Sequence, residues 1–163
     1  MQNNFFSNLR IESKNKILLV LLSIISAVWL FGIFSSSILG ESSFGLLANF
    51  YLSFLYSKVC HQADHKSFML GVDQLLVCSR CTGIYIGVFF SLIISLFVSK
   101  NFSKKMLMII YLAVFILLLD VLVNNYFLTN YFKISAFISG FIFAFLISLF
   151  SINYFKKESY DIK

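Results

Sequence analysis

The sequence predicts an all-α integral membrane protein: a bundle of four transmembrane helices, with an amphipathic helix and a Cys/His loop between helices 1 and 2. Of its 163 residues, 60% are hydrophobic and only 12% are charged, about half the charged fraction usual in soluble domains. The mean hydropathy is +0.89. Several apolar runs are also long enough, or nearly so, to cross a hydrocarbon core of roughly 30 Å as helices.

The apolar runs cover residues 17–39, 82–98, 106–123 and 134–151. A lipid core offers no water to backbone N–H and C=O groups, so each run is expected to cross it as a helix, whose backbone hydrogen bonds are internal. The second and fourth runs are somewhat short, which implies tilt or local thinning of the bilayer. No linker or low-complexity segment divides the chain, so residues 1–163 are predicted to form a single membrane domain.

Between the first two spans, residues 44–58 read FGLLANFYLSFLYSK. Five apolar residues share one helical stripe: Phe44, Leu47, Tyr51, Phe54 and Leu55. This spacing predicts an amphipathic helix that lies in the membrane interface or packs as a half-inserted fifth element. In either position the helix delivers Cys60 and His61 to the membrane surface.

Basic residues flank the spans and predict their orientation. Three clusters precede the first span, join the second to the third and follow the fourth: Arg10, Lys14 and Lys16; Lys100, Lys104 and Lys105; Lys156, Lys157 and Lys163. In a four-span protein these clusters share one side, which the positive-inside rule assigns to the cytoplasm. The sequence therefore predicts a multi-pass protein of the cell membrane with cytoplasmic N- and C-termini and with residues 40–81 facing outward.

Two other interpretations of these features are less favoured. The first apolar run exceeds the 7–15 residues of a signal-peptide core and no clear cleavage site follows, so we expect it to be retained. The net charge of +6 arises at the ends of the spans, and no basic face with interleaved aromatic residues remains to bind nucleic acid. The predicted partner is the lipid bilayer, with a lipid or a lipid-linked molecule as the candidate substrate.

All the cysteines and histidines of the chain lie in the outward segment: Cys60, His61, His65, Cys78 and Cys81. The C-x-x-C spacing of the last two cysteines lets two thiolates grip one tetrahedral ion from a tight turn, and the Cys60-His61 pair arrives from upstream. Zinc is the simplest ion for such ligands and needs no redox partner. The predicted zinc ligands are Cys60, Cys78, Cys81 and either His61 or His65. A complete ligand set would be structural, whereas an open position would activate water.

The same residues allow two other interpretations. A C-x-x-C at the outer end of a helix in a four-span protein is also how quinone-coupled disulfide oxidoreductases are arranged. Three cysteines, however, leave one without a partner in a relay that usually needs two pairs. Alternatively, the cysteines are small buried residues, or two of them form a plain disulfide.

Two charged residues accompany the predicted metal site. Arg80 lies between the two C-x-x-C cysteines, either as an outward charge at the headgroups or as a clamp for an anion. Asp120 lies inside the third span, where a carboxylate is costly unless it faces the bundle interior or a partner. Asp120 is therefore a candidate metal ligand, a candidate hydrogen-bond partner for a metal-binding histidine, or a candidate general base. The plainer alternative is a helix-end carboxylate that reaches water or pairs with Lys133.

Three stretches, CHQADHKSF, VCSRCTGIYIG and LLDVLVNN, resemble prokaryotic membrane proteins grouped as domain-of-unknown-function family 2085. The resemblance covers roughly residues 50–145 and implies no established activity. The motif positions are Cys60, His61, Gln62, Ser67, Phe68, Cys78, Arg80, Cys81, Thr82, Gly83, Tyr85, Gly87 and Asp120. Lys66 and Lys133 stand where arginine is more usual, and Val121 stands where glycine is common. His65 lies outside the motif, so His61 ranks above it as a ligand.

These observations lead to one functional hypothesis and two alternatives. An outward zinc site, with Asp120 and Arg80 as catalytic groups, would act as a hydrolase or transferase on a lipid-linked or headgroup-level substrate. The alternatives are a quinone-coupled thiol oxidoreductase and a non-catalytic protein whose metal fastens the loop to the bundle.

Overall fold

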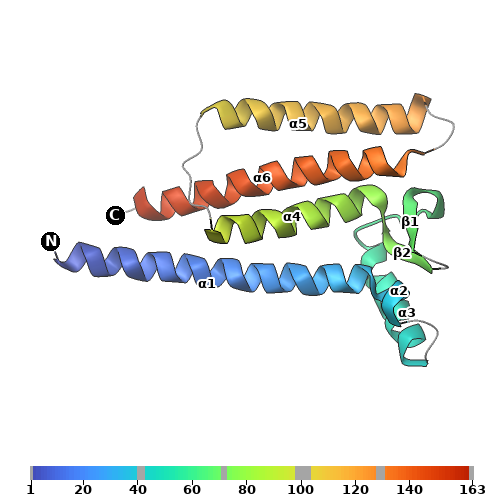
Figure 1. Cartoon of the computed structure of the whole chain (residues 1–163), viewed down its shortest axis with the longest axis horizontal. Coiled ribbons are helices and arrows are strands. Elements are labelled where there is room, and N and C mark those ends of the chain that lie inside the picture. Colours follow the sequence, from blue (N-terminus) through green and yellow to red (C-terminus); the bar gives the residue numbers. More distant parts are fainter. Residues whose placement is uncertain (1, 40–42, 71–72, 98–103, 128–130, 162–163) are drawn as a thin grey trace.

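The computed structural model describes residues 2–39, 43–70, 73–97, 104–127 and 131–161 (Figure 1). Its elements, in chain order, are α1 (Gln2–Ile33), α2 (Ser35–Leu39), α3 (Ser43–Ser57), a 3₁₀ turn (Asp64–Lys66), β1 (Ser67–Leu70), β2 (Asp73–Cys78), α4 (Ser79–Phe97), α5 (Lys104–Leu122), a π-helical turn (Val123–Phe127) and α6 (Lys133–Asp161). Lys100 and Lys163, two of the residues used to predict orientation, lie outside the described residues.

Within the described residues, four helices are long and apolar enough to cross a membrane: Lys16–Ile33, Ser79–Phe97, Leu107–Tyr126 and Lys133–Phe155. The predicted fold class is therefore confirmed. Large apolar side chains such as Ile25, Val28 and Phe115 are exposed along these helices. That exposure suits a lipid environment, because there the apolar surface faces acyl chains instead of water.

The long helices lie side by side in the order α1, α4, α6 and α5 (Figure 1). The α4–α6 contact is the most extensive, and the α5–α6 and α1–α4 contacts complete the layer. Small residues let α4 and α6 approach closely: a Cβ atom added at Gly87 would lie 2.6 Å from the carbonyl oxygen of Phe141, and one at Gly140 would lie 2.6 Å from that of Arg80. Helix packing thus accounts for the Gly83/Gly87 spacing.

The first span ends earlier than the apolar run suggests. We predicted a helix over residues 17–39, but α1 ends at Ile33 and the short helix α2 follows a turn at Phe34. The Ser35 hydroxyl donates to the Gly32 carbonyl at 2.7 Å and lies 3.3 Å from Asn49 Oδ1 in α3. Serine side chains that bond to the backbone in this way offer it an alternative to a continued helix.

Residues 67–78, predicted as part of a loop, form an antiparallel β-hairpin. Ser67 pairs with Cys78, Met69 with Gln74 and Leu70 with Asp73, with an irregularity between Ser67 and Met69. Leu75 and Val77 alternate with less buried neighbours along β2 and point into the protein. The hairpin adds a rigid element at the start of α4 that the sequence analysis did not foresee.

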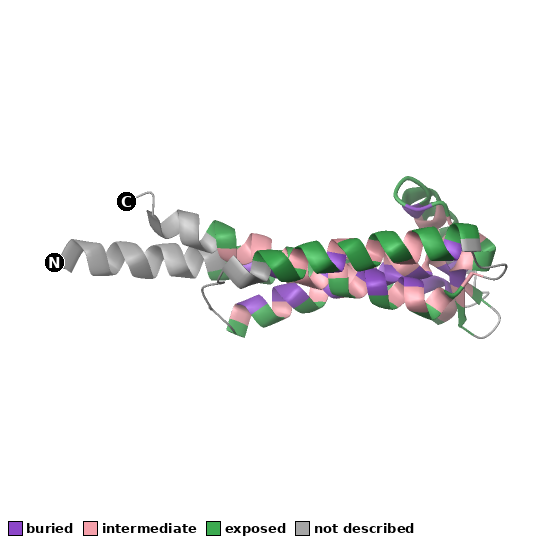
Figure 2. Ribbon diagram, turned by 90° about the horizontal axis from the view of Figure 1, so that it is seen from above, coloured by how far each residue is buried: buried purple, intermediate pink, exposed green. Residues whose placement is uncertain are grey.

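The described part of the molecule has two distinct ends. The N-terminal end of α1 and the C-terminal end of α6 lie together, opposite the hairpin (Figure 1). Figure 2 shows that buried residues follow the interior of the helix layer up to the hairpin end. There a small core of Ile33, Tyr56, Cys60 and Val77 joins α1, α3 and β2. We call this the cysteine end, because it holds Cys60, Cys78 and Cys81.

Candidate metal centre

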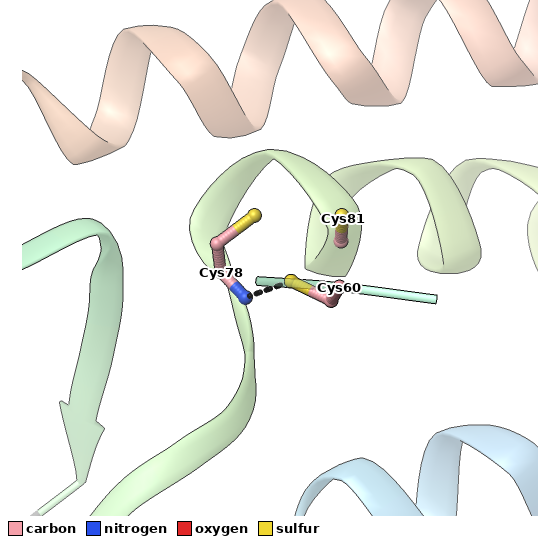
Figure 3. Close-up of side chains that lie close together, drawn as sticks. All are labelled: Cys60, Cys78 and Cys81. Atoms are coloured by element: carbon pink, nitrogen blue, oxygen red, sulfur yellow. Dashed lines mark hydrogen bonds between the residues drawn. The ribbon is translucent and has the colours of Figure 1, made fainter. Parts of the chain in front are cut away.

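Three thiols converge at the cysteine end (Figure 3). Cys60 follows α3, Cys78 is the last residue of β2, and Cys81 lies in the first turn of α4. All are free thiols, and their sulfur atoms lie within 4.8 Å of one another. Three separate segments of the chain therefore contribute one sulfur each to a single cluster.

The end of α3 places Cys60. The Cys60 N–H donates to the carbonyl of Tyr56 at 2.9 Å, which continues the helical hydrogen bonding past Ser57. Tyr56 is 1% exposed, and its hydroxyl donates to the carbonyl of Trp29 in α1 at 2.7 Å. Burial raises the pKa of Tyr56 to about 12, so the hydroxyl keeps its proton for this bond. Cys60 is thereby fixed relative to α1.

Gln62 holds the chain that leaves Cys60. Its backbone has a positive φ of 48°, a left-handed conformation that is uncommon for residues other than glycine. Its side-chain amide donates to the carbonyls of Ser53 at 3.0 Å and Leu76 at 2.9 Å, which ties α3 to β2. We had not included Gln62 among the site residues; its place directly after Cys60-His61 in the family motif was the only signal for it.

The start of α4 places the other two thiols. The Cys78 N–H donates to the Cys60 sulfur at 3.2 Å (Figure 3). The Thr82 hydroxyl donates to the Cys78 carbonyl at 3.1 Å across the first turn. Because α4 begins at Ser79, three residues earlier than predicted, Cys81 lies inside the helix and the C-x-x-C spacing fixes both thiols on one turn.

The thiols of this cluster differ in acidity. Hydrogen bonds from Cys78 and Cys81 hold the pKa of the Cys60 thiol far below its usual range, whereas the hydrogen bond to Cys60 raises the pKa of Cys78. The first negative charge of the cluster therefore rests on Cys60, and the neighbouring thiols share their protons with it. A divalent cation would displace those protons and bind the thiolates.

The spacing of the sulfurs fits a zinc ion. With Zn–S bonds of about 2.3 Å in a tetrahedron, bound sulfurs lie about 3.8 Å apart. The observed sulfurs, within 4.8 Å of one another, approach that spacing closely enough for small side-chain rotations to complete it. Thiolates are also the soft ligands that zinc accepts readily. The Cys60, Cys78 and Cys81 group could thus hold one metal ion.

The histidines lie outside this group of sulfurs. His61 is exposed beside Cys60, and its ring does not belong to the group of converging ligand atoms among the described residues. His65 is also exposed, with its ring edge-on to Tyr131 at 6.4 Å between centroids. The structure therefore brings together three of the four predicted metal ligands, and His61 as the fourth stays a prediction.

Arg80 and Asp120 form an ion pair with each other. Arg80 Nη2 donates to Asp120 Oδ2 at 2.7 Å, and the two side chains are 19% and 7% exposed. Asp120 also accepts hydrogen bonds from Asn124 at 2.9 Å, from Ser139 at 3.0 Å and from Ser135. The carboxylate joins α4, α5 and α6, and its cationic partner is Arg80 in place of the alternative Lys133.

Asn124 completes this network from the π-helical turn. Its amide nitrogen donates to the backbone carbonyl and the carboxylate of Asp120, and its oxygen accepts the Phe132 N–H at 2.8 Å. The side chain is buried, and turns of this kind often occur at functional sites. Asn124 was not among the predicted site residues, so its role in holding Asp120 was missed.

Comparison with known proteins adds a family but no activity. The model of a family described as "Predicted membrane protein (DUF2085)" matches residues 60–150, more than half of the chain. An uncharacterized protein of Methanocaldococcus jannaschii is 41% identical over 63 residues, which are 38% of this chain and 40% of that relative. No solved structure matches the chain. The chain belongs to the DUF2085 family of predicted membrane proteins, as its Cys-His-Gln and C-x-x-C segments indicated.

Proposed function

We propose that this protein is a zinc protein of the cell membrane, in which the thiolates of Cys60, Cys78 and Cys81 hold one ion at the cysteine end. The convergence of three free thiols from three segments within 4.8 Å is the observation that carries the proposal. The N–H donated by Cys78 and the nearby thiols favour a thiolate at Cys60, which is the form that binds metal. Zinc accepts such a sulfur-rich set without redox chemistry.

The basic residues support a placement of this end on the outer side. The helix ends that carry Lys104, Lys105, Lys156 and Lys157 lie at the opposite end of the layer, with the chain termini. The positive-inside rule assigns that opposite end to the cytoplasm. We therefore propose that residues 1–163 form one membrane domain with cytoplasmic termini and an outward-facing metal site.

A fourth tetrahedral position remains for a ligand beyond the three thiolates. We propose His61 for it, because His61 directly follows Cys60 and is exposed and free to turn. If His61 closes the position, the site is structural and fastens α3 and β2 to α4. If the position is left to water, zinc would supply a nucleophile or polarise a substrate oxygen at the membrane surface.

In the catalytic version of this proposal, the protein is a hydrolase or transferase with a lipid-linked or headgroup-level substrate. Arg80 would then bind an anionic group of the substrate, since guanidinium matches phosphate and carboxylate geometry. Asp120, which already accepts hydrogen bonds from four side chains, would hold Arg80 in position instead of acting as a general base. The nearness of the cysteine end to the headgroup level is what favours a lipid substrate.

Metal analysis of detergent-purified protein tests the zinc site. We expect about one zinc per chain, with every cysteine titrating as a thiol after denaturation without reductant. Cys60→Ser should remove most of the zinc, whereas Asp64→Ala, which removes an exposed carboxylate outside the cluster, should leave it in place. His61→Ala separates the two versions: weaker zinc binding indicates a closed structural site, and unchanged binding indicates an open one. Purified protein without zinc would contradict the proposal.

A second candidate function follows from the position of the C-x-x-C pair at the N-terminus of α4. Cys78 directly precedes the helix and Cys81 lies in its first turn, the C-x-x-C arrangement of thiol–disulfide exchange sites, and the thiolate of the cluster is Cys60. In this version two thiols are oxidised to a disulfide while a membrane quinone accepts two electrons and two protons to give the quinol. Metal-free protein that is purified with a disulfide and reacts with a quinone would favour this function over zinc binding.

A further inference from the structure

Helix α3 lies at the cysteine end, outside the four candidate spans. Figure 1 shows it beside α2 at the end of α1, steeply inclined to the long helices instead of alongside them. One side of α3 is packed against the protein: Tyr56 is buried, and Asn49 contacts Ser35 of α2. This side fixes the orientation of the helix and leaves the opposite side exposed.

The exposed side of α3 is apolar over almost its whole length. Six large side chains are between 48% and 71% exposed: Leu46, Leu47, Phe50, Tyr51, Phe54 and Leu55. At 100° per residue these positions cover one continuous half of the helix. The helix contains no charged residue between Ser43 and Ser57, and Lys58 is the first to follow. A contiguous apolar surface of this kind is rare where a protein faces water.

We propose that this half of α3 is inserted into the membrane leaflet at the cysteine end, with the helix lying in the plane of the interface. Exposed apolar side chains near the end of the first span, Phe31 and Ile38, continue the surface that the transmembrane helices present to lipid. A helix that lies across the spans, at their end, meets the leaflet along its length. Insertion would bury the exposed side chains by about 5–10 Å at the boundary between headgroups and acyl chains.

The residues at the edge of this surface match an interface. Tyr51 combines an apolar ring with a polar hydroxyl, as the aromatic residues at membrane boundaries do. The Lys58 ammonium lies 4.7 Å from the centre of the Phe54 ring, so the aliphatic stem of this lysine follows the apolar surface while its charge remains at the rim. A lysine in this position reaches the lipid phosphates.

Insertion of α3 has a consequence for the candidate metal centre. Cys60 continues the hydrogen bonding of α3, so the cluster would be held at the depth of the lipid headgroups. The inference goes beyond the proposed zinc site, because the apolar half of α3 needs cover whether or not a metal is bound. Its test can therefore fail while zinc binding stands, and the reverse.

Depth-dependent fluorescence quenching tests the proposal in the intact protein. The chain has one tryptophan, and Trp29→Phe removes it while keeping the backbone carbonyl that Tyr56 uses. In that background, Phe50→Trp is reconstituted into phosphatidylcholine vesicles with bromine atoms either near the headgroup or near the chain end. Phe115→Trp, exposed on the middle of α5, reports deep insertion, and Asp73→Trp, exposed on the hairpin, reports water.

We expect Phe50→Trp to be quenched mainly by the shallow bromines, Phe115→Trp mainly by the deep ones, and Asp73→Trp by neither. Leu47→Trp, on the same half of α3, should repeat the shallow pattern and replaces Phe50→Trp if that variant is poorly folded. Two outcomes would overturn the proposal: no quenching at either α3 position, or deep quenching at both. Zinc content measured on the same samples shows whether the metal centre is affected.

Discussion

Replacement of Asp120 by asparagine should destabilise the protein strongly. The change leaves the Arg80 guanidinium without a counter-ion, although its side chain is only 19% exposed. It also replaces the carboxylate that accepts the Asn124 amide hydrogen bond in the unaltered protein with a second amide. Removing one partner of a buried ion pair typically costs about 3–5 kcal/mol. For a protein of this size about 1 kcal/mol corresponds to 2–4 °C, so we expect the melting temperature to fall by about 6–20 °C.

Thermal unfolding of detergent-purified protein, followed by size-exclusion chromatography after heating, measures this effect. Asp64→Asn is the matched control, because it neutralises an exposed carboxylate and should change the melting temperature little. The double variant Asp120→Asn with Arg80→Leu removes the unpaired charge and should recover part of the loss. A melting temperature for Asp120→Asn within about 2 °C of the unaltered protein would refute the reasoning, since the pair would then contribute less than about 1 kcal/mol.

Four further outcomes are expected. Gly87→Ala should lower the melting temperature by overpacking worth about 1–3 kcal/mol, because its Cβ would meet the Phe141 carbonyl at 2.6 Å. Gln62→Ala leaves two carbonyls without their donor and should cost about 1–3 kcal/mol and weaken zinc binding, as measured by metal titration. Tyr56→Phe should cost about 1 kcal/mol in the same melting assay, because the bond to Trp29 is lost. Acidification during dialysis should release zinc, because protons compete for the thiolates.

The membrane helices were predictable because apolar length is a local property of the sequence. The C-terminal end of the first span was not: the run of apolar residues continues past Ile33, but the Ser35 hydroxyl bonds to the backbone and the chain turns into α2. The hairpin was missed because only Leu75 and Val77 alternate clearly in β2. Strand pairing also depends on residues such as Ser67, eleven positions away from its partner Cys78.

The thiol cluster was predictable because the C-x-x-C spacing brings Cys78 and Cys81 together within one turn. The Arg80–Asp120 pair was not, although both residues were singled out, because they are 40 positions apart. Lys133 is nearer in the sequence and was the obvious alternative partner for Asp120. The close approach of α4 to α6 decides which cation pairs with Asp120. Gly140 packs against the Arg80 backbone and permits that approach.

The first turn of α4 belongs to both polar networks, since Arg80 lies between the two cysteines of the C-x-x-C pair. The thiols, however, are held by contacts that do not involve the Arg80 side chain: the Cys78 N–H, the Thr82 hydroxyl and the Gln62 amide. We therefore expect Asp120→Asn to lower the melting temperature while zinc bound at 4 °C stays near one ion per chain.

That separation has a functional meaning. If zinc is retained while an activity on a lipid substrate is lost, Arg80 acts on the substrate and Asp120 positions it, as the catalytic version of the proposal requires. If zinc and stability are lost together, the ion pair positions the thiols, and the metal serves to hold the hairpin and α3 against the membrane helices. Parallel metal analysis and melting curves on the same Asp120→Asn sample distinguish these results, because they depend on whether Cys78 and Cys81 stay in place once Arg80 has lost its ion pair with Asp120.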